Sequence, residues 1–493
     1  MGGGRTALGV LLIALFSGIL LGLTACGDVR SDLVTPAQPV WSNRVDLVGS
    51  AAVVDDVVLS YVNSGDDRLE IVAWDVATGV ELWRDGVAIQ GHRYDWLNVA
   101  TASAGDDELV GYLQDDETDP TGWWQRLVVA EPRTGQHLAI ENPVVQARGS
   151  PAQCADGADI CVEGWLDDDT EGPRHTYRLD PDSGRLARDP SAAGLPAGAW
   201  YIATHVFSAG GRTADDPEQV GYAVDGAISW QRAYADVFGA GYSVDGGWQW
   251  IDRPGLDVVI GVGSPSRPEV DALPVAEYPL TDSVTVALRR ADGTTVWRMP
   301  AADPWCGPAG VSSDLIHQTL PLCRYDAGSF TVDRSDPDDV TATVHGVDAT
   351  LLGVDPETGA ERWTLPLGSD DSIYPVDTSE FRSTLARQPV SIDGTLTMVD
   401  VLSGETTTAP ARARVACETD REPFRARVPG SDDPGELHEF SAGAGTSACD
   451  GHARPLDDDA FTVGAVEMAG IDAGDGWFIV DGVDSVSGYR IEE

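Results

Sequence analysis

Two stretches of the chain share one phrase: residues 73–83 read AWDVATGVELW, and residues 353–363 read GVDPETGAERW. In each, an apolar run leads to aspartate, two further residues, threonine and glycine, and a tryptophan follows four residues after the glycine. Aspartate and threonine side chains bind nearby backbone N–H groups, and glycine accepts the positive φ that closes a turn. The phrase therefore predicts a β-hairpin that carries a tryptophan on its second strand.

Degenerate copies of this phrase run along the chain. Two keep an Asp-Gly turn and the tryptophan: VDGAISW at 224–230 and ADGTTVW at 291–297. Four keep the turn without the tryptophan and end at Gly135, Gly184, Gly404 and Gly488. The spacing between successive turn glycines varies from 42 residues (184 to 226) to 84 residues (404 to 488).

The segments before these turns alternate as β-strands do. Leu69, Ile71 and Ala73 fall on one face of a strand, and 285–288 and 395–399 are similarly short and β-branched. No comparable window after residue 25 has helical periodicity. Since one hairpin cannot bury its own apolar face, radial stacking and ring closure are expected. The sequence predicts an all-β fold: a single β-propeller of eight four-stranded blades over 41–493, with seven blades as the alternative.

The phrase resembles the repeat of the pyrroloquinoline-quinone-type propellers, the quinoprotein alcohol dehydrogenase-like (PQQ-like) family. That family also contains the propeller lipoprotein of the outer-membrane β-barrel assembly machinery. The resemblance covers most of 41–493 and implies that repeat tryptophans pack between adjacent blades. It gives this structural role to Trp83, Trp230, Trp297 and Trp363. Trp41, ahead of the first full hairpin, is expected to lie on the strand that closes the ring.

The N-terminus predicts a lipid anchor. An apolar run over 6–25 ends in Leu23-Thr24-Ala25-Cys26, which resembles the lipobox of bacterial lipoproteins. The resemblance implies that 1–25 is a signal peptide and that Cys26 becomes the acylated N-terminus; an uncleaved anchor helix is the alternative. Residues 26–40 are expected to form a tether. The body should lie on the outer, extracytoplasmic face of the cell membrane.

The charge limits the partners. The formal net charge is −48, and every basic residue is arginine, in which the chain resembles actinobacterial surface proteins. Such a charge argues against binding to nucleic acid or anionic lipid and permits cationic partners or divalent ions. The simpler interpretation of the negative charge is that it keeps an exported domain soluble.

Six cysteines follow Cys26, and an even number in an exported chain indicates disulfides. Pairing of nearest neighbours is the simplest of fifteen arrangements: Cys154–Cys161, Cys306–Cys323 and Cys417–Cys449. None forms a CxxC motif, so a metal ribbon is not expected.

Catalytic signatures are missing from the sequence. In the PQQ-like family, the dehydrogenases use a disulfide between adjacent cysteines, and this chain has no adjacent pair. No catalytic residue, cofactor or metal ligand is assigned. Acidic clusters at 167–169, 370–371 and 457–459 lack the spacing of a calcium loop. The aromatic stretches 123–124 and 248–250 could be core or an exposed binding platform.

By elimination, the sequence predicts a non-catalytic, membrane-anchored binding or scaffold lipoprotein that presents a propeller face to a protein or cell-envelope partner. Two alternatives stay open. One is a quinoprotein-like oxidoreductase, or another enzyme, with its site in the central channel. The other is a small-ligand sensor or solute-binding component.

Overall fold

The protein is described from a computed structural model, which covers residues 32–492 with internal gaps. The longest gaps are 89–96, 167–174, 189–199, 210–217, 305–317, 370–378 and 428–436. Nearly all regular structure is β-strand, which confirms the predicted all-β class. The helices are short: α3 (Tyr234–Phe238), α4 (Pro268–Asp271), the 3₁₀ turn η2 (Leu280–Asp282) and α5 (Val463–Ala469).

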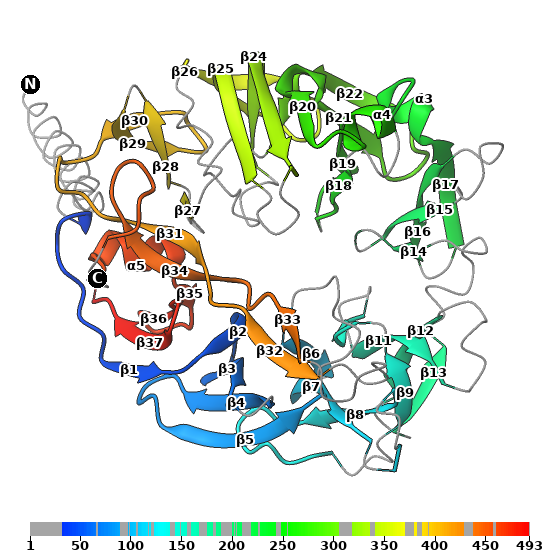
Figure 1. The fold of residues 1–493 in the computed structure, drawn as a ribbon, viewed down its shortest axis with the longest axis vertical. Helices are drawn as coiled ribbons and strands as arrows, with labels where there is room; N and C mark the ends of the chain where they lie inside the picture. Colours follow the sequence, from blue (N-terminus) through cyan, green and yellow to red (C-terminus); the bar gives the residue numbers. More distant parts are fainter. Residues whose placement is uncertain are drawn as a thin grey trace, which may run out of the picture.

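Antiparallel sheets follow one another round a ring in chain order, and the body is a β-propeller (Figure 1). The first sheet contains β2 (Leu47–Val54), β3 (Val57–Asn63), β4 (Leu69–Asp75) and β5 (Glu81–Val87). The next begins with β6 (Ala100–Ala104), β7 (Asp107–Asp115) and β8 (Gln125–Ala130). Strand β9 (Val144–Ala147) joins it to β10 (Ala152–Gln153), β11 (Ile160–Trp165), β12 (His175–Asp180) and β13 (Arg185–Arg188).

Three further sheets continue the ring along its right side and top in Figure 1. One contains β14 (Trp200–Tyr201), β15 (Val206–Ala209), β16 (Gln219–Val224) and β17 (Ala227–Ala233). The next contains β18 (Trp248–Ile251), β19 (Val258–Gly263), β21 (Val284–Arg289) and β22 (Thr295–Pro300). The third contains β23 (Ala302–Asp303), β24 (Leu320–Asp333), β25 (Thr341–Val354) and β26 (Glu361–Gly368).

The strands near the C-terminus divide among small sheets. One contains β28 (Arg387–Ile392), β29 (Thr395–Asp400) and β30 (Thr406–Thr408). Another contains β27 (Ser379–Phe381), β31 (Val415–Asp420) and β34 (Ala444–Cys449), and a third pairs β32 (Phe424–Arg427) with β33 (Leu437–Phe440). Because of this division, and because β9 joins two sheets, the number of blades stays a prediction.

The ring closes by pairing the two ends of the chain. Strand β1 (Trp41–Arg44) lies against β37 (Ser485–Arg490), in one sheet with β36 (Trp477–Asp481) and β35 (Ile471–Asp472). Figure 1 shows the blue β1 beside the red β37. Trp41 stands opposite Gly488 in this pairing, on the closing strand as the sequence led us to expect.

Each repeat tryptophan lies on the turn glycine of the next sheet. Trp83 covers Gly135, and Trp297 covers Gly359; a Cβ at either glycine would come within 2.6 Å of the indole. The indole Nε1–H donates to the backbone carbonyl three residues before that glycine, 2.7 Å away at Pro132 and 2.8 Å away at Pro356. Equivalent contacts are Trp41 on Gly79, Trp230 on Gly293 and Trp363 on Gly404. These glycines also have φ near +70°, so a side chain there would meet both strain and a ring.

The central strands of the sheets are apolar on both faces, because each face packs against a neighbouring sheet. Leu69, Ile71 and Ala73 of β4 face one cluster, as their alternation predicts, while Val72 and Trp74 face another. Stacking of sheets thus hides both faces of each central strand.

Gly488, predicted as a turn glycine, lies inside β37 instead. A Cβ there would come within 2.3 Å of the Trp41 indole, so the closing strand requires glycine at this position. The helix α5 was also not predicted. It has seven residues, too few for a periodic pattern, and Thr462 caps it by accepting a hydrogen bond from the Ala465 N–H.

The described part of the predicted tether packs against the body. Residues 32–37, here called the docking segment, run between the loops that precede β31 and α5. The Leu33 carbonyl accepts from the Arg414 N–H, and the Thr35 carbonyl accepts from the Val463 N–H, each at 2.9 Å. The Leu33 side chain is buried with Val415 and other residues of one apolar cluster. Part of the predicted tether of 26–40 therefore contacts the propeller, and the bounds of the tether stay a prediction.

A second connection spans the ring closure. Residues 421–443, here called the strap, carry β32 and β33 from β31 to β34. Phe424 and Phe440 stack at 5.3 Å, and Phe424 packs into the cluster of Tyr61 and Tyr112. At its root, the buried Arg421 donates to the carbonyls of Gly49 in β2 and of Gly482. The strap therefore fastens the first sheet to the last.

Candidate functional site

Two of the predicted disulfides are present in the structure. Cys154 bonds to Cys161 across a separation of seven residues, and Cys417 bonds to Cys449, joining β31 to β34 at the base of the strap. Cys323 is buried in β24, and its predicted partner Cys306 lies outside the described residues. The lipidation site Cys26 lies outside them as well.

The acidic and aromatic candidates do not converge on one site. The clusters at 167–169, 370–371 and 457–459 lie outside the described residues. Trp123 is exposed, Trp124 is half-buried and Trp250 is buried in the core, which separates the two aromatic stretches into different environments. Within the described ranges, no group of three or more His, Cys, Asp or Glu side chains is arranged to hold a metal ion.

A buried carboxylate joins the β14–β17 sheet to the next sheet. Asp252, just after β18, accepts from His205 at 2.9 Å and pairs with Arg290 at 2.5 Å. The Arg290 guanidinium also lies 5.9 Å from the centre of the Tyr222 ring. Burial and the nearby Asp252 charge raise the pKa of Tyr222. The group spans two sheets beside the Trp230 contact, so it fastens the junction.

A related group lies at the junction of β5 and β7. Asp85 accepts from Tyr112 at 2.7 Å and contacts His137 at 2.9 Å. Tyr112 stacks on Trp83 with 6.5 Å between ring centres. Burial, together with the Asp85 hydrogen bond, raises the pKa of Tyr112 far above its usual range. Here too a carboxylate, a histidine and a tyrosine surround a docking tryptophan.

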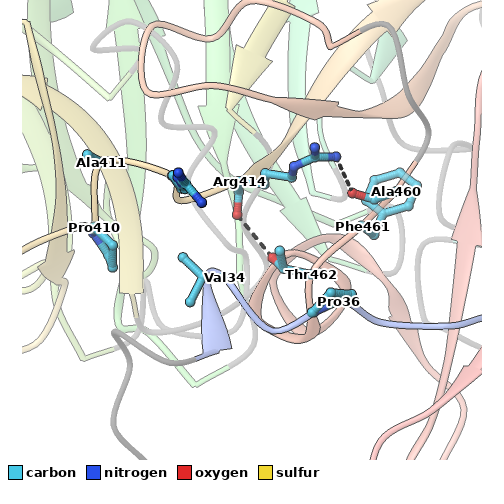
Figure 2. Close-up of a pocket in the computed structure, with 9 residues that line it drawn as sticks. Val34, Pro36, Pro410, Ala411, Arg414, Ala460, Phe461 and Thr462 are labelled. Carbon is cyan, nitrogen blue, oxygen red and sulfur yellow. Dashed lines mark hydrogen bonds between the residues drawn. The ribbon is translucent and has the colours of Figure 1, made fainter.

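A cavity of about 620 Å³, here called the N-terminal pocket, opens beside the docking segment. Figure 2 shows its three walls: Val34 and Pro36 from the docking segment, Pro410 and Ala411 from the loop before β31, and Ala460, Phe461 and Thr462 from the loop before α5. Two arginines, Arg412 and Arg414, complete the lining.

Hydrogen bonds hold the walls of the pocket together. Arg414 Nη1 donates to the Ala460 carbonyl at 3.0 Å, and the Thr462 hydroxyl donates to the Arg414 carbonyl at 3.1 Å; both bonds are dashed in Figure 2. Pro36 and Thr462 form an antiparallel bridge. Arg412 is exposed and forms no ion pair or hydrogen bond with any residue that the structure describes. The pocket thus has an apolar wall, one fixed cation and one unpaired cation.

Sequence reasoning missed the pocket and both carboxylate groups. The pocket unites residues near 34, 412 and 461, and the Asp252 group unites residues near 205, 252 and 290. No local spacing signals such a group, because ring closure and blade stacking bring the residues together. The arginine-rich run from Arg412 to Arg427 was the one local sign that this part of an acidic chain differs.

Comparison with known proteins finds likeness of structure only. No protein-family model and no curated protein sequence matches the chain. BamB from Moraxella catarrhalis is a similar solved structure, with 13% identity over 92% of this chain and 100% of that one and a TM-score of 0.34. Quinohemoprotein alcohol dehydrogenase ADHIIG from Pseudomonas putida HK5 matches at 12% identity over 94% of this chain and 77% of its own, with a TM-score of 0.42.

The β-propeller domain of the Trilobed protease from Pyrococcus furiosus is a further similar structure. It has 10% identity over 79% of this chain and 97% of that one, with a TM-score of 0.32. These likenesses extend no function to this chain. None of the helices in the described ranges is long and apolar enough to span a membrane.

Proposed function

We propose that the protein is a lipid-anchored binding or scaffold lipoprotein on the outer face of the cell membrane, which presents its propeller to an envelope protein. The observation that carries the proposal is the docking segment. Leu33 is buried only seven residues after Cys26 (26 to 33). An acylated Cys26 would therefore hold a closed ring close to the bilayer. Such an arrangement suits a protein whose task is to position a surface for a membrane-bound partner.

One departure from the repeated hairpins forms the surface that this proposal assigns to the partner. Strand β20 (Val275–Pro279) lies in the chain between β19 and β21, but it pairs with β24 of the following sheet. Beyond Tyr325, β24 and β25 continue as a long hairpin alongside β20. Leu273 and Val275, at the start of β20, are 49% and 46% exposed. Neighbouring exposed apolar side chains on an added strand are typical of a protein-contact surface.

Photo-crosslinking in the native envelope tests this proposal. A photoreactive residue placed near β20 should capture one defined envelope protein, and Leu273→Glu with Val275→Glu should abolish that capture. The matched control is Val224→Glu with Ile228→Glu, which adds the same two charges to another exposed apolar pair in β16 and β17. Equal capture by both double variants, or none by the unaltered protein, would contradict the proposal.

The anchor is tested separately. Cys26→Ser should shift the protein from the membrane fraction to the soluble fraction and remove the mass of the attached lipid. If the Cys26→Ser protein stays in the membrane fraction with an uncleaved N-terminus, the apolar run is a spanning helix and the lipoprotein assignment is wrong.

A further inference from the structure

We propose that the N-terminal pocket binds the phosphate of a phospholipid headgroup in the leaflet that holds the Cys26 lipid. This inference rests on the lipid anchor of the proposed function. It assigns a second, non-covalent membrane contact to the body of the protein.

The described lining of the pocket is basic, although the chain as a whole is acidic. The chain has 80 Asp and Glu residues against 32 basic ones, yet none of the nine described residues that line the pocket is acidic. Two of the nine are arginines, and Arg412 forms no ion pair or hydrogen bond with the described part of the chain. In so acidic a protein, exposed arginines have many possible carboxylate partners. Within the described part of the chain Arg412 has no such partner, and an arginine in this state beside a second arginine favours a phosphate oxygen.

The pocket has the size of a small-molecule site and an apolar wall beside its arginines. A cavity of about 620 Å³ lies within the range of about 300–1,000 Å³ usual for small-molecule sites. Val34, Pro410 and Phe461 give it an apolar wall. Val34 is 40% exposed, although the neighbouring Leu33 is buried. A ligand with an anionic head and an apolar continuation matches this lining, and a phospholipid has both.

The pocket is close in sequence to the predicted lipidation site Cys26. Val34 follows Cys26 by eight residues (26 to 34), which span at most about 26–29 Å when fully extended. With Cys26 acylated at the bilayer surface, the pocket cannot lie farther than this from the headgroups. Phospholipid phosphates are then the most abundant anions within its range.

The part of the net charge of −48 that lies on distant sheets does not oppose this contact at short range. Salt screens charges beyond about 8–10 Å, so the carboxylates of the far sheets contribute little at the pocket. The repulsion expected from composition acts on approach from solution. The covalent anchor removes that step, because it already holds the protein at the membrane.

The test uses the full-length lipidated protein in vesicles of phosphatidylglycerol that contain a photoactivatable phosphatidylglycerol. Mass spectrometry should locate crosslinks in 410–414 and 460–462. The substitution Arg412→Gln should reduce them about fivefold, since each arginine near an anionic surface contributes about a factor of five. The control Arg425→Gln removes another exposed arginine, which is paired with Glu439 at 3.2 Å, and should leave the crosslinks unchanged.

Two further arms separate the outcomes. Vesicles of a phosphate-free glycolipid with a photoactivatable analogue should give few crosslinks at these peptides. Glycerol phosphate added in solution should compete weakly. If it binds in an Arg412-dependent way while the vesicle lipid gives no crosslinks, the pocket serves a soluble phosphate compound and the lipid assignment is overturned.

Failure of the pocket and failure of the anchor are distinguishable. Suppose that mass spectrometry shows the lipid on Cys26. Then the pocket proposal alone is overturned if no crosslinks form, or if the Arg412→Gln and Arg425→Gln variants give equal crosslinks. Absence of the lipid on Cys26 overturns the proposed function and removes the reach argument. Thermal unfolding of both variants in detergent should match that of the unaltered protein, which shows that any loss is not unfolding.

Discussion

Two sheet junctions use the same docking contact and differ in the polar group beside it. Between β5 and the next sheet, Trp83 lies on Gly135. Between β17 and the next sheet, Trp230 lies on Gly293. At each junction an indole Nε1–H donates to a turn carbonyl, a tyrosine ring stacks on the tryptophan, and an aspartate contacts a histidine.

The aspartates differ in burial and in partner. The Asp85 side chain is 30% exposed and has Tyr112 and His137 as partners. The Asp252 side chain is 2% exposed and pairs with Arg290 as well as His205. A buried carboxylate needs a cation, whereas one that reaches solvent is satisfied by water and other hydrogen-bond donors. The apolar contact is thus repeated around the ring, and the charge pairing follows local burial.

The largest effect is expected from removing the shared contact. Replacing Trp230 by alanine should lower the free energy of unfolding by about 3–5 kcal/mol, because a large buried ring is lost and a cavity is left. Replacing Trp83 should cost toward the lower end of that range, since its ring is only half-buried. Denaturant midpoints measure both. A loss under about 1 kcal/mol at Trp230 would show that the docking contact is not what joins the sheets.

Removing the aspartate should lower the free energy of unfolding by different amounts at the two junctions. Asp252→Ala leaves the Arg290 charge without its buried partner and should cost about 3 kcal/mol. Asp85→Ala removes one part-buried and one exposed hydrogen bond and should cost about 1 kcal/mol. The control Arg290→Met with Asp252→Leu removes both charges and should recover much of the loss. Equal costs for the two single variants would mean that burial does not distinguish these carboxylates.

The sequence predicted the repeated parts of the molecule and missed the parts made by closure. The turn phrase located the glycines at 79, 135, 184, 293, 359 and 404, all of which have positive φ. It also placed Trp41 on the closing strand, because a strand–turn–strand unit carries its signal locally. Gly488 was wrongly predicted as a turn glycine because the sequence before it matches the Asp-x-x-Ser-Gly turn pattern. In the structure Gly488 lies within β37, where the absence of a side chain leaves room for the Trp41 ring.

The candidate sites were beyond local patterns. Asp252 and Arg290 are 38 residues apart (252 to 290), and Val34 and Phe461 come from opposite ends of the chain. These residues become neighbours only when the sheets stack into a closed ring, and neither composition nor sequence spacing shows which residues that brings together. The docking segment was missed for a related reason. Leu33 is a single apolar anchor among polar residues, and one buried side chain makes no periodicity.

The smallest effect should appear when pH is lowered, at the turns that receive the two tryptophans. Burial raises the pKa of Glu131, but hydrogen bonds from the Thr134 hydroxyl and two backbone N–H groups outweigh it and leave the pKa below its ordinary value. The Thr294 hydroxyl and N–H lower the pKa of Asp292 in the same way. A carboxyl whose pKa is lower in the folded state stabilises the fold above its unfolded pKa, and this contribution is lost as pH falls through the folded pKa.

The junction at Trp83 should therefore weaken first on acidification, because the ordinary pKa of glutamate is higher than that of aspartate. Glu131→Gln should cost about 0.3 kcal/mol near neutral pH, the size expected for an exposed charge. That cost should shrink as pH falls below about 4.3, the ordinary pKa of glutamate, while the cost of Asp292→Asn should persist to lower pH. Denaturant midpoints of both variants across this range measure the difference. A cost of Glu131→Gln that is constant with pH would show that its hydrogen bonds act without the charge.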